Sequence, residues 1–307
     1  MAVQIDQRVG DDERRESLYQ GNIHVTSPTA VTEAYCAFTR DLVQEAFGDL
    51  DPEFAQDHMP VAQFAEILSS LKPRFIHHPR CKEFLREILA ERGCDLECTY
   101  FDVPRLRTST SGGYLTTGIA YAWHPHRDTW YSAPMHQLNF WMPVYDVTAG
   151  NAMAFHTEYF ASVVPNSSHE YNYYEWNSKH RASAASNIGT ETRPLPGPTG
   201  EVDISDPLVL LTPIGGLIEF SGQQLHSSIP NQSGRTRYSI DFRTVHIGDI
   251  VAGRSAPNVD ANCTGSSIRD FIRASDFSPM PAEIVEHFLD GTESRGDLVY
   301  AAPSTAD

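Results

Sequence analysis

Two kinds of hydrophobic pattern divide the chain. In the first part, apolar residues recur at helical spacing, as in the run 31–46, which follows the capping sequence Ser-Pro-Thr at 27–29. Further helices are expected over 60–71, which opens on a proline, and over 80–92, which ends before a glycine. The pattern therefore predicts a helical N-terminal part, residues 1–93, that serves as scaffold.

The pattern changes to that of β-structure at about residue 94. Short runs rich in β-branched and aromatic residues alternate with glycine-containing turns. The expected strands are 95–103, 113–124, 136–147, 151–156, 207–213, 215–222 and 235–247. Strands without intervening helices predict a mainly β core, a sandwich or double-sheet jelly roll, over about 94–250. The C-terminal tail, 251–307, returns to helical patterns at 267–273 and 281–289.

One long interruption, residues 157–206, separates two of the expected core strands. It contains the aromatic sequence HEYNYYEWN and the Pro/Gly-rich sequence RPLPGPTG. A loop this long inside a compact domain is more often functional than connecting. We expect a lid that is the most mobile part of the protein and that orders over the site when substrate binds. No repeat or linker divides the chain, so residues 1–307 are expected to form a single domain.

Composition and charge narrow the class of protein. The 307 residues are 40% hydrophobic, and 23 basic against 40 acidic residues give a net charge of −17. Such a charge repels phosphate backbones and anionic membranes, so no nucleic-acid or membrane partner is expected. No run approaches the ~18 apolar residues of a membrane span, and the N-terminus lacks the apolar core of a secretory signal. These features predict a cytoplasmic protein and leave the oligomeric state open.

The cysteines do not indicate a disulfide framework, because their number, five, is odd and the chain is large. Cys94 and Cys98 form a C-x3-C motif, which hints at a metal site. No second Cys or His pair follows at zinc-finger spacing, so ordinary thiols are the favoured interpretation.

The candidate chemistry begins in the segment WHPHRDTWY, 123–131. Alternate side chains of a strand share a face, so His126 and Asp128 are expected to point the same way. An imidazole nitrogen and a carboxylate oxygen are two of the three ligands of a 2-His-1-carboxylate Fe(II) site. His226, which follows the apolar run GGLIEF, is the candidate third ligand. His124 shares the face and is an alternative ligand, although only His126 has a carboxylate two residues further on.

An arginine pattern follows the distant histidine. If His226 closes one strand and Arg237 opens the next, a hairpin brings the guanidinium to the metal cavity. A planar, permanently charged group suits the far carboxylate of a dicarboxylate co-substrate. Ser239 lies on the same face of the strand and adds a hydroxyl. Arg235 and Arg243 are rival candidates for the carboxylate.

Together these motifs resemble the Fe(II)/2-oxoglutarate-dependent dioxygenases, most closely the phytanoyl-CoA dioxygenase-like branch that includes ectoine hydroxylases. The matching segments are WHPHRDTWY (123–131), QLNFWMPVYD (137–146), GNAMAF (150–155) and HSSIPNQSGRTRYS (226–239). The resemblance implies a double-stranded β-helix (jelly roll) with flanking N- and C-terminal helices. It also implies an enzyme that uses O2 to hydroxylate or otherwise oxidise an unactivated C–H bond, releasing succinate and CO2 from 2-oxoglutarate.

The resemblance assigns roles to particular residues. Fe(II) is held by His126, Asp128 and His226. The co-substrate 2-oxoglutarate is held by Arg237 and Ser239, assisted by Gln137 or Asn139. Candidate substrate contacts, on a small polar metabolite, natural-product intermediate or sugar-like molecule, are Thr129, Trp130, Tyr131, Tyr173 and Trp176. The sequence departs from the family at 154–158, where Ala-Phe-His-Thr-Glu replaces Pro-Gly-Ser-His, and in a longer lid.

Two other classes of protein remain open. A cupin-type isomerase or 2-oxoglutarate-independent dioxygenase would use His124, His126 and His226, but it requires a Glu shortly after the first His pair, and 129–133 contains none. A non-catalytic jelly-roll binding module, such as a lectin, has no need for this combination of histidines, aspartate and arginine.

Overall fold

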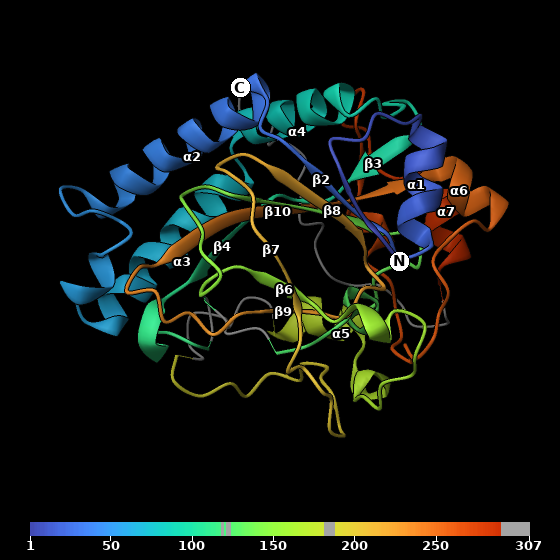
Figure 1. Ribbon diagram of the computed structural model, residues 1–307. Helices are drawn as coiled ribbons and strands as arrows, with labels where there is room; N and C mark the ends of the chain where they lie inside the picture. Colours follow the sequence, from blue (N-terminus) through green and yellow to red (C-terminus); the bar gives the residue numbers. More distant parts are fainter. Residues whose placement is uncertain (118–119, 121–123, 181–187, 290–307) are drawn as a thin grey trace.

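The computed structural model describes residues 1–117, 120, 124–180 and 188–289, and it contains two β-sheets flanked by helices (Figure 1). The strands are β1 (Val3–Ile5), β2 (Ile23–Thr26), β3 (Thr99–Phe101), β4 (Arg105–Ser109), β5 (Leu138–Pro143), β6 (Met153–Phe155), β7 (Leu208–Leu210), β8 (Leu217–Ser221), β9 (His226–Ser228), β10 (Arg237–His246) and β11 (Ile272–Arg273). The α-helices are α1 (Asp11–Tyr19), α2 (Ala30–Phe47), α3 (Val61–Ile76), α4 (Pro79–Glu91), α5 (Tyr173–Glu175), α6 (Ile247–Ala252) and α7 (Ala282–His287).

The main sheet is organised around β10. Its eight strands follow the order β1-β2-β8-β5-β10-β3-β11, with β4 also paired to β10. β5 runs antiparallel along one side of β10, with Arg243 opposite Asn139, while β4 and β3 share the other side. The second sheet is small and has the order β7-β6-β9.

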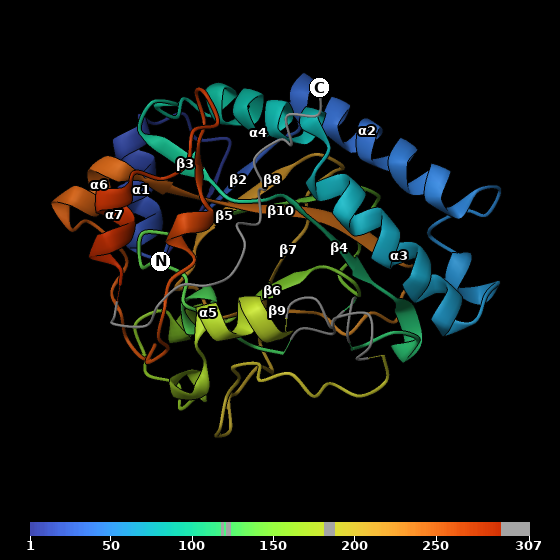
Figure 2. The same cartoon turned by 180° about the vertical axis from the view of Figure 1, so that it is seen from behind.

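The two faces of the main sheet bury different kinds of residue. Toward the helices, β10 places Tyr238, Ile240 and Phe242 in the principal apolar core. Figures 1 and 2 show α2, α3 and α4 on this side of the sheet. Because strand residues alternate between faces, the intervening positions of β10 turn to the opposite side. The first four of these positions are polar or charged, namely Arg237, Ser239, Asp241 and Arg243, and the fifth, Val245, packs in a separate apolar cluster.

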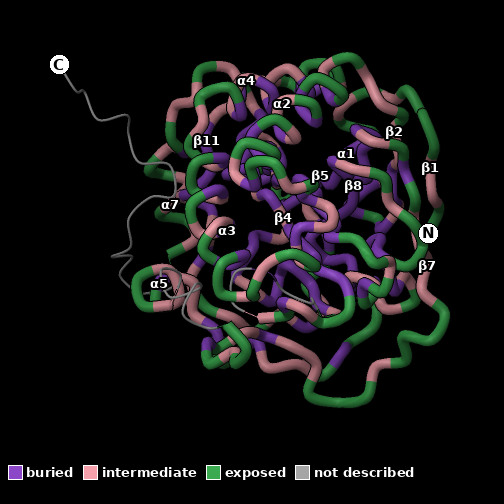
Figure 3. Tube along the Cα trace, turned by 90° about the vertical axis from the view of Figure 1, so that its left-hand side faces the viewer, coloured by how far each residue is buried: buried purple, intermediate pink, exposed green. Residues whose placement is uncertain are grey.

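An apolar cluster joins the two sheets. Trp141, Ile218 and Phe220 of the main sheet pack with Met153 and Phe155 of β6. Figure 3 shows buried residues gathered in the interior, with exposed positions on the outer helix surfaces and loops. Between the sheets, beside this cluster, lies the cavity described below. None of the helices in the described part of the chain combines the length and apolar character needed to cross a lipid bilayer.

Within residues 1–93 the three expected helices are confirmed, but the beginning of this part contains two strands, β1 and β2, beside α1. α2, α3 and α4 lie where the pattern predicted them, and α2 begins with a capping box between Thr29 and Thr32. However, β1 and β2 extend the main sheet, because β2 pairs with β8. Strands this short show no detectable alternation in sequence, and their pairing depends on a distant edge.

Six of the seven expected strands are present in shortened form. The prediction of a seventh strand over 113–124 is wrong, because the residues of this range that the structure describes do not form a strand. Ser111–Gly113 forms a 3-10 turn in which Gly112 and Gly113 have φ of 65° and 73°, values that extended backbone excludes. Residues 118–119 and 121–123 lie outside the described residues. β4 and β9 were not expected.

The expected helix over 267–273 is also wrong. A 3-10 turn at Ile268–Asp270 leads directly into β11, which pairs with β3. The edge of β3 supplies a hydrogen-bonding partner that outweighs the local helical pattern. The second tail helix is confirmed as the shorter α7.

Candidate metal centre and cavity

A backbone bridge holds the two candidate histidines opposite each other. His126 lies just before a 3-10 turn, and His226 opens β9; each amide donates to the other's carbonyl at 3.0 Å. Their ring centroids are 4.3 Å apart. The expected strand through His126 and Asp128 is wrong, because Asp128 begins the turn. That turn brings the carboxylate back toward both histidines.

Each imidazole is oriented by a carbonyl two residues before it. Nδ1 of His126 lies 2.9 Å from the carbonyl oxygen of His124, and Nδ1 of His226 lies 2.9 Å from that of Gln224. A carbonyl only accepts, so Nδ1 carries the proton and Nε2 presents a lone pair. The two Nε2 atoms lie 3.6 and 4.0 Å from the same oxygen, Oδ1 of Asp128. All three ligand atoms lie within 4.8 Å of one another, which suits one metal ion.

The second oxygen of Asp128 is already engaged. Oδ2 accepts from Nε2 of Gln137 at 2.9 Å and from Nε of Arg243 at 3.2 Å. Asp102 in turn fixes Arg243, accepting from its backbone amide at 2.9 Å and from its Nη1 at 3.2 Å. The carboxylate therefore offers one oxygen, Oδ1, toward the histidines.

The charge states of these residues match those of metal ligands. Burial by itself raises the pKa of Asp128, but Arg243 and the two histidines outweigh burial and hold the pKa well below its usual range. Burial lowers the pKa of His226 to about 3, reinforced by His126 and opposed by Asp128. An ionised carboxylate and a neutral imidazole are the forms that bind metals. Two imidazoles and one carboxylate are the donor set of a non-haem Fe(II) site.

A cavity of about 370 Å³ opens at this centre and extends between the two sheets. The main sheet contributes polar and aromatic side chains to its wall: Asn139, Trp141, Phe220, Arg237, Asp241 and Arg243. The long segment 157–206 contributes a second wall made of Tyr171, Tyr173, Trp176, Arg193 and Leu195. Tyr131 of the 3-10 turn also lines the cavity. The centroids of its ring and of the His126 ring are 5.6 Å apart.

Arg237 and Ser239 have donors that no described residue of the protein uses. Nη1 of buried Arg237 donates to the carbonyl of Asn151 at 3.0 Å, but its Nε has no hydrogen-bond partner in the described part of the chain. The fully buried Oγ of Ser239 has none there either. Burial and the nearby Arg107 lower the pKa of Arg237 to about 10, against the opposing effect of Asp241. Arg237 is therefore charged at neutral pH, and its unused donor fits an anionic ligand.

The rival arginines occupy other environments. Arg235 is exposed, 3.8 Å from Glu53 and stacked over the ring of Phe54, and it does not line the cavity. Arg243 lines the cavity but pairs with two carboxylates of the protein. The geometry therefore favours Arg237 for a bound carboxylate. The expected hairpin is wrong, because β9 belongs to the small sheet and β10 to the main sheet.

The 3-10 turn separates the predicted substrate contacts into two groups. Residues three apart eclipse in a 3-10 helix, so Tyr131 faces the cavity with Asp128. Trp130 turns into the core instead, fully buried with Nε1 donating to Asp260 at 2.7 Å, and Thr129 donates to Gln223 at 3.1 Å. The prediction that Thr129 and Trp130 contact substrate is therefore corrected. Tyr173 and Trp176, also predicted, line the cavity.

The remaining predicted polar residues lie close to the centre. Gln137 bridges Oδ2 of Asp128 and Oδ1 of Asn139, both at 2.9 Å, so it orients the carboxylate. Asn139 faces the cavity. The side chain of His124 is exposed, and its backbone carbonyl contacts Nδ1 of His126 in the candidate centre.

Sequence reasoning missed Asp102, which fixes Arg243. Asp102 directly follows the short β3, where nothing local distinguishes it from an ordinary surface carboxylate. Tyr171, which lines the cavity, belongs to the aromatic sequence of the expected lid, HEYNYYEWN.

The chain matches no family model and no curated protein. Among solved structures, it is similar to EvdO2 from Micromonospora carbonacea var. aurantiaca complexed with 2-oxoglutarate (14% identity over 79% of this chain and 93% of that chain, TM-score 0.44). It is also similar to the non-heme monooxygenase ThoJ in a Ni complex (16%, 72% and 71%, 0.35) and to the non-heme alpha-ketoglutarate-dependent epimerase SnoN from nogalamycin biosynthesis (14%, 76% and 82%, 0.38). Similarity at this level assigns neither family nor activity to the chain.

Proposed function

We propose that the chain is a non-haem Fe(II)- and 2-oxoglutarate-dependent oxygenase of the double-stranded β-helix type. In this proposal His126, Asp128 and His226 hold Fe(II), and Arg237 with Ser239 binds the far carboxylate of 2-oxoglutarate. One observation carries the proposal. Nε2 of His126 and Nε2 of His226 both lie near Oδ1 of Asp128. The same cavity contains the buried cation Arg237, whose Nε is not used by any described residue.

The protein's part in such a reaction is to hold its groups in fixed positions. Bound Fe(II) with 2-oxoglutarate supplies the oxidation of a C–H bond by O2, with succinate and CO2 as co-products. His126, Asp128 and His226 would hold Fe(II) through three ligand atoms, and such a ligand set would leave the metal able to bind 2-oxoglutarate and O2. Gln137 and Arg243 fix the carboxylate, and backbone carbonyls fix both imidazoles, so the three ligand atoms are preorganised.

The cavity wall supports a small polar or sugar-like metabolite, or a natural-product intermediate, as substrate. Tyr131, Tyr171, Tyr173 and Trp176 line the cavity, and aromatic side chains of this kind pack against the rings of a bound molecule. A cavity of about 370 Å³ is within the range of small-molecule sites. We also propose that the protein acts in the cytoplasm. We propose that its activity involves neither a nucleic acid nor a membrane.

The test is 2-oxoglutarate binding to metal-loaded Arg237→Ala, measured by anaerobic calorimetry, together with succinate release. Deleting one partner of a buried charge pair costs about 3–5 kcal/mol. The affinity for 2-oxoglutarate should therefore fall by roughly 150- to several-thousand-fold. Arg237→Lys should recover only part, because an ammonium lacks the planar two-point contact. Fe(II) affinity should be nearly unchanged in both variants.

The matched control is Arg235→Ala, two residues away on the exposed surface, which should bind 2-oxoglutarate like the wild type. The reverse result, loss in Arg235→Ala and none in Arg237→Ala, would refute the assignment of the carboxylate site. Metal-dependent turnover without any 2-oxo acid would replace the proposal with the cupin-type alternative.

A further inference from the structure

A second group of metal-ligand side chains lies at the other end of β10 from Arg237. His246 is the last residue of that strand and pairs with Thr99 of β3, directly after Cys98. Asp95 begins the turn that leads into β3. None of Asp95, Cys98 and His246 lines the cavity.

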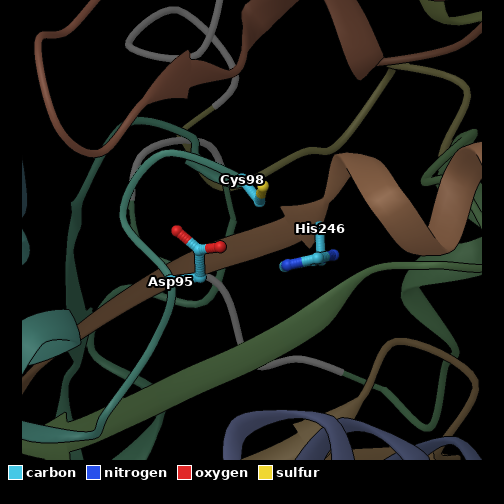
Figure 4. A group of neighbouring side chains, drawn as sticks. All are labelled: Asp95, Cys98 and His246. Atoms are coloured by element: carbon cyan, nitrogen blue, oxygen red, sulfur yellow. The ribbon is translucent and has the colours of Figure 1, made fainter.

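We propose that Asp95, Cys98 and His246 form a second metal site, which binds a divalent transition-metal ion, with zinc as the best match. One carboxylate oxygen, one thiol sulfur and one imidazole nitrogen lie within 4.8 Å of one another. Figure 4 shows the three side chains around a common space, with the imidazole directed toward Asp95. Sulfur, nitrogen and oxygen donors of these types form zinc sites, and three protein ligands leave a position for water.

The backbone fixes the positions from which these ligands project. The carbonyl of Cys98 accepts from the amide of Ile247 at 2.8 Å, which ties the turn to the residue after His246. The carbonyl of Asp95 accepts from the amides of Cys98 and Thr99 at 3.1 and 2.8 Å. Three side chains from two chain segments are thus held together without a metal, so binding requires little rearrangement.

The surroundings of His246 also resemble those of a metal ligand. Among the described residues its Nδ1 has no hydrogen-bond partner, and it lies 4.0 Å from Oδ1 of Asp249. Asp249 is buried: its Oδ2 accepts from Arg15 at 2.6 Å and from Tyr19 at 3.1 Å, and its Oδ1 pairs with Arg254 at 2.5 Å. Metal-bound histidines commonly have such a carboxylate beside their other ring nitrogen.

The local charge and exposure suit a cation from solvent. Asp95 is exposed and Cys98 half-buried, so the site is open to ions. Glu97 and Asp11 add negative charge nearby, while Arg15 is paired with carboxylates. Burial and the adjacent Asp95 raise the pKa of Cys98, so the thiol is protonated without metal, and binding releases its proton to solvent.

The experiment is a Co²⁺ titration of the metal-free full-length protein. Cobalt bound to a thiolate gives near-ultraviolet charge-transfer bands that nitrogen and oxygen ligands do not give. We expect these bands to appear in the wild type, to disappear on adding Zn²⁺, and to persist in a His126→Ala/Asp128→Ala/His226→Ala variant, where they should saturate at one equivalent. Persistence there separates this site from the proposed iron site, on which the inference does not depend.

Two single variants test the ligands. Cys98→Ser should abolish the bands and weaken Zn²⁺ binding at least tenfold, whereas Cys94→Ser, the matched control, should leave both unchanged. Asp95→Asn, which alters an exposed side chain and should fold normally, should keep the bands and weaken Zn²⁺ binding about tenfold. Absence of thiolate bands in the wild type, or bands that survive Cys98→Ser or depend on Cys94, would overturn the proposal.

Discussion

At the scale of single residues, the two oxygens of Asp128 have separate environments. Oδ1 faces the histidines, while Oδ2 is held by Gln137 and Arg243. Arg243 is itself positioned by Asp102, which contacts neither histidine in the described structure but determines where the guanidinium lies. Metal affinity should therefore depend on residues that are not themselves ligands.

Replacing Arg243 tests this dependence. Arg243→Met removes the charged donor at Oδ2, a hydrogen bond of about 1.5–3 kcal/mol for a charged group. We expect divalent-metal affinity to fall by about 10- to 100-fold, measured by Mn²⁺ titration of the metal-free protein. Arg235→Met, which removes an exposed arginine, is the control and should bind Mn²⁺ normally. Wild-type affinity in Arg243→Met would mean that Gln137 alone is sufficient to orient Asp128.

At the scale of elements, one buried carboxylate joins two helices to the main sheet. Glu219 of β8 is fully buried on the helix side, where the residue opposite it in β5 is the apolar Phe140. Its Oε2 accepts from Arg14 of α1 at 2.8 Å, and its Oε1 accepts from Arg92, at the end of α4, at 2.7 Å. Both oxygens are satisfied by charged donors, so removing the carboxylate takes from Arg92 the ion-pair partner that the described structure gives it and leaves Arg14 paired with Asp11 alone.

We expect Glu219→Ala to lower the free energy of unfolding by about 3–5 kcal/mol, because deleting one partner of a buried ion pair leaves the other charge uncompensated. Urea denaturation measures the loss. The matched control is Glu45→Ala, which removes the exposed pair with Arg74 and should cost about 0–1 kcal/mol. Equal effects of the two substitutions would show that the buried cluster contributes no more than a surface pair.

At the scale of the whole molecule, stability should depend on pH through histidines that folding buries. Burial lowers the pKa of His24, against the opposing effect of Glu219, and that of His136, against Asp249. A histidine whose pKa is lowered by folding binds fewer protons in the folded than in the unfolded state. Its contribution to stability is therefore present above the unfolded value of about 6.5 and is lost as pH falls toward the folded value.

The urea midpoint should accordingly be lower at pH 5 than at pH 7.5, measured with a chelator so that metal binding does not contribute. His24→Gln removes one of these groups and should show a smaller decrease over the same pH interval. An unchanged pH dependence in His24→Gln would mean that protonation of His24 does not destabilise the fold.

Local pattern was sufficient to predict much of the framework and the residue types of the centre. The helical spacing of α2 to α4 and the β-rich runs of β5, β8 and β10 were visible in the sequence, because both depend on neighbouring residues. The pattern H-x-D with a distant His and Arg also selected four residues that the structure brings to one cavity.

Which side chains meet was decided only by the tertiary structure. Nothing local distinguishes Arg243, paired with Asp128, from exposed Arg235, or shows that Trp130 enters the core while Tyr131 reaches the cavity. The edge strands β1 and β2 likewise exist through pairing with β8. The physical reason is that sequence periodicity specifies which faces alternate but not the register between distant strands, and a shift of one residue turns each side chain to the opposite face.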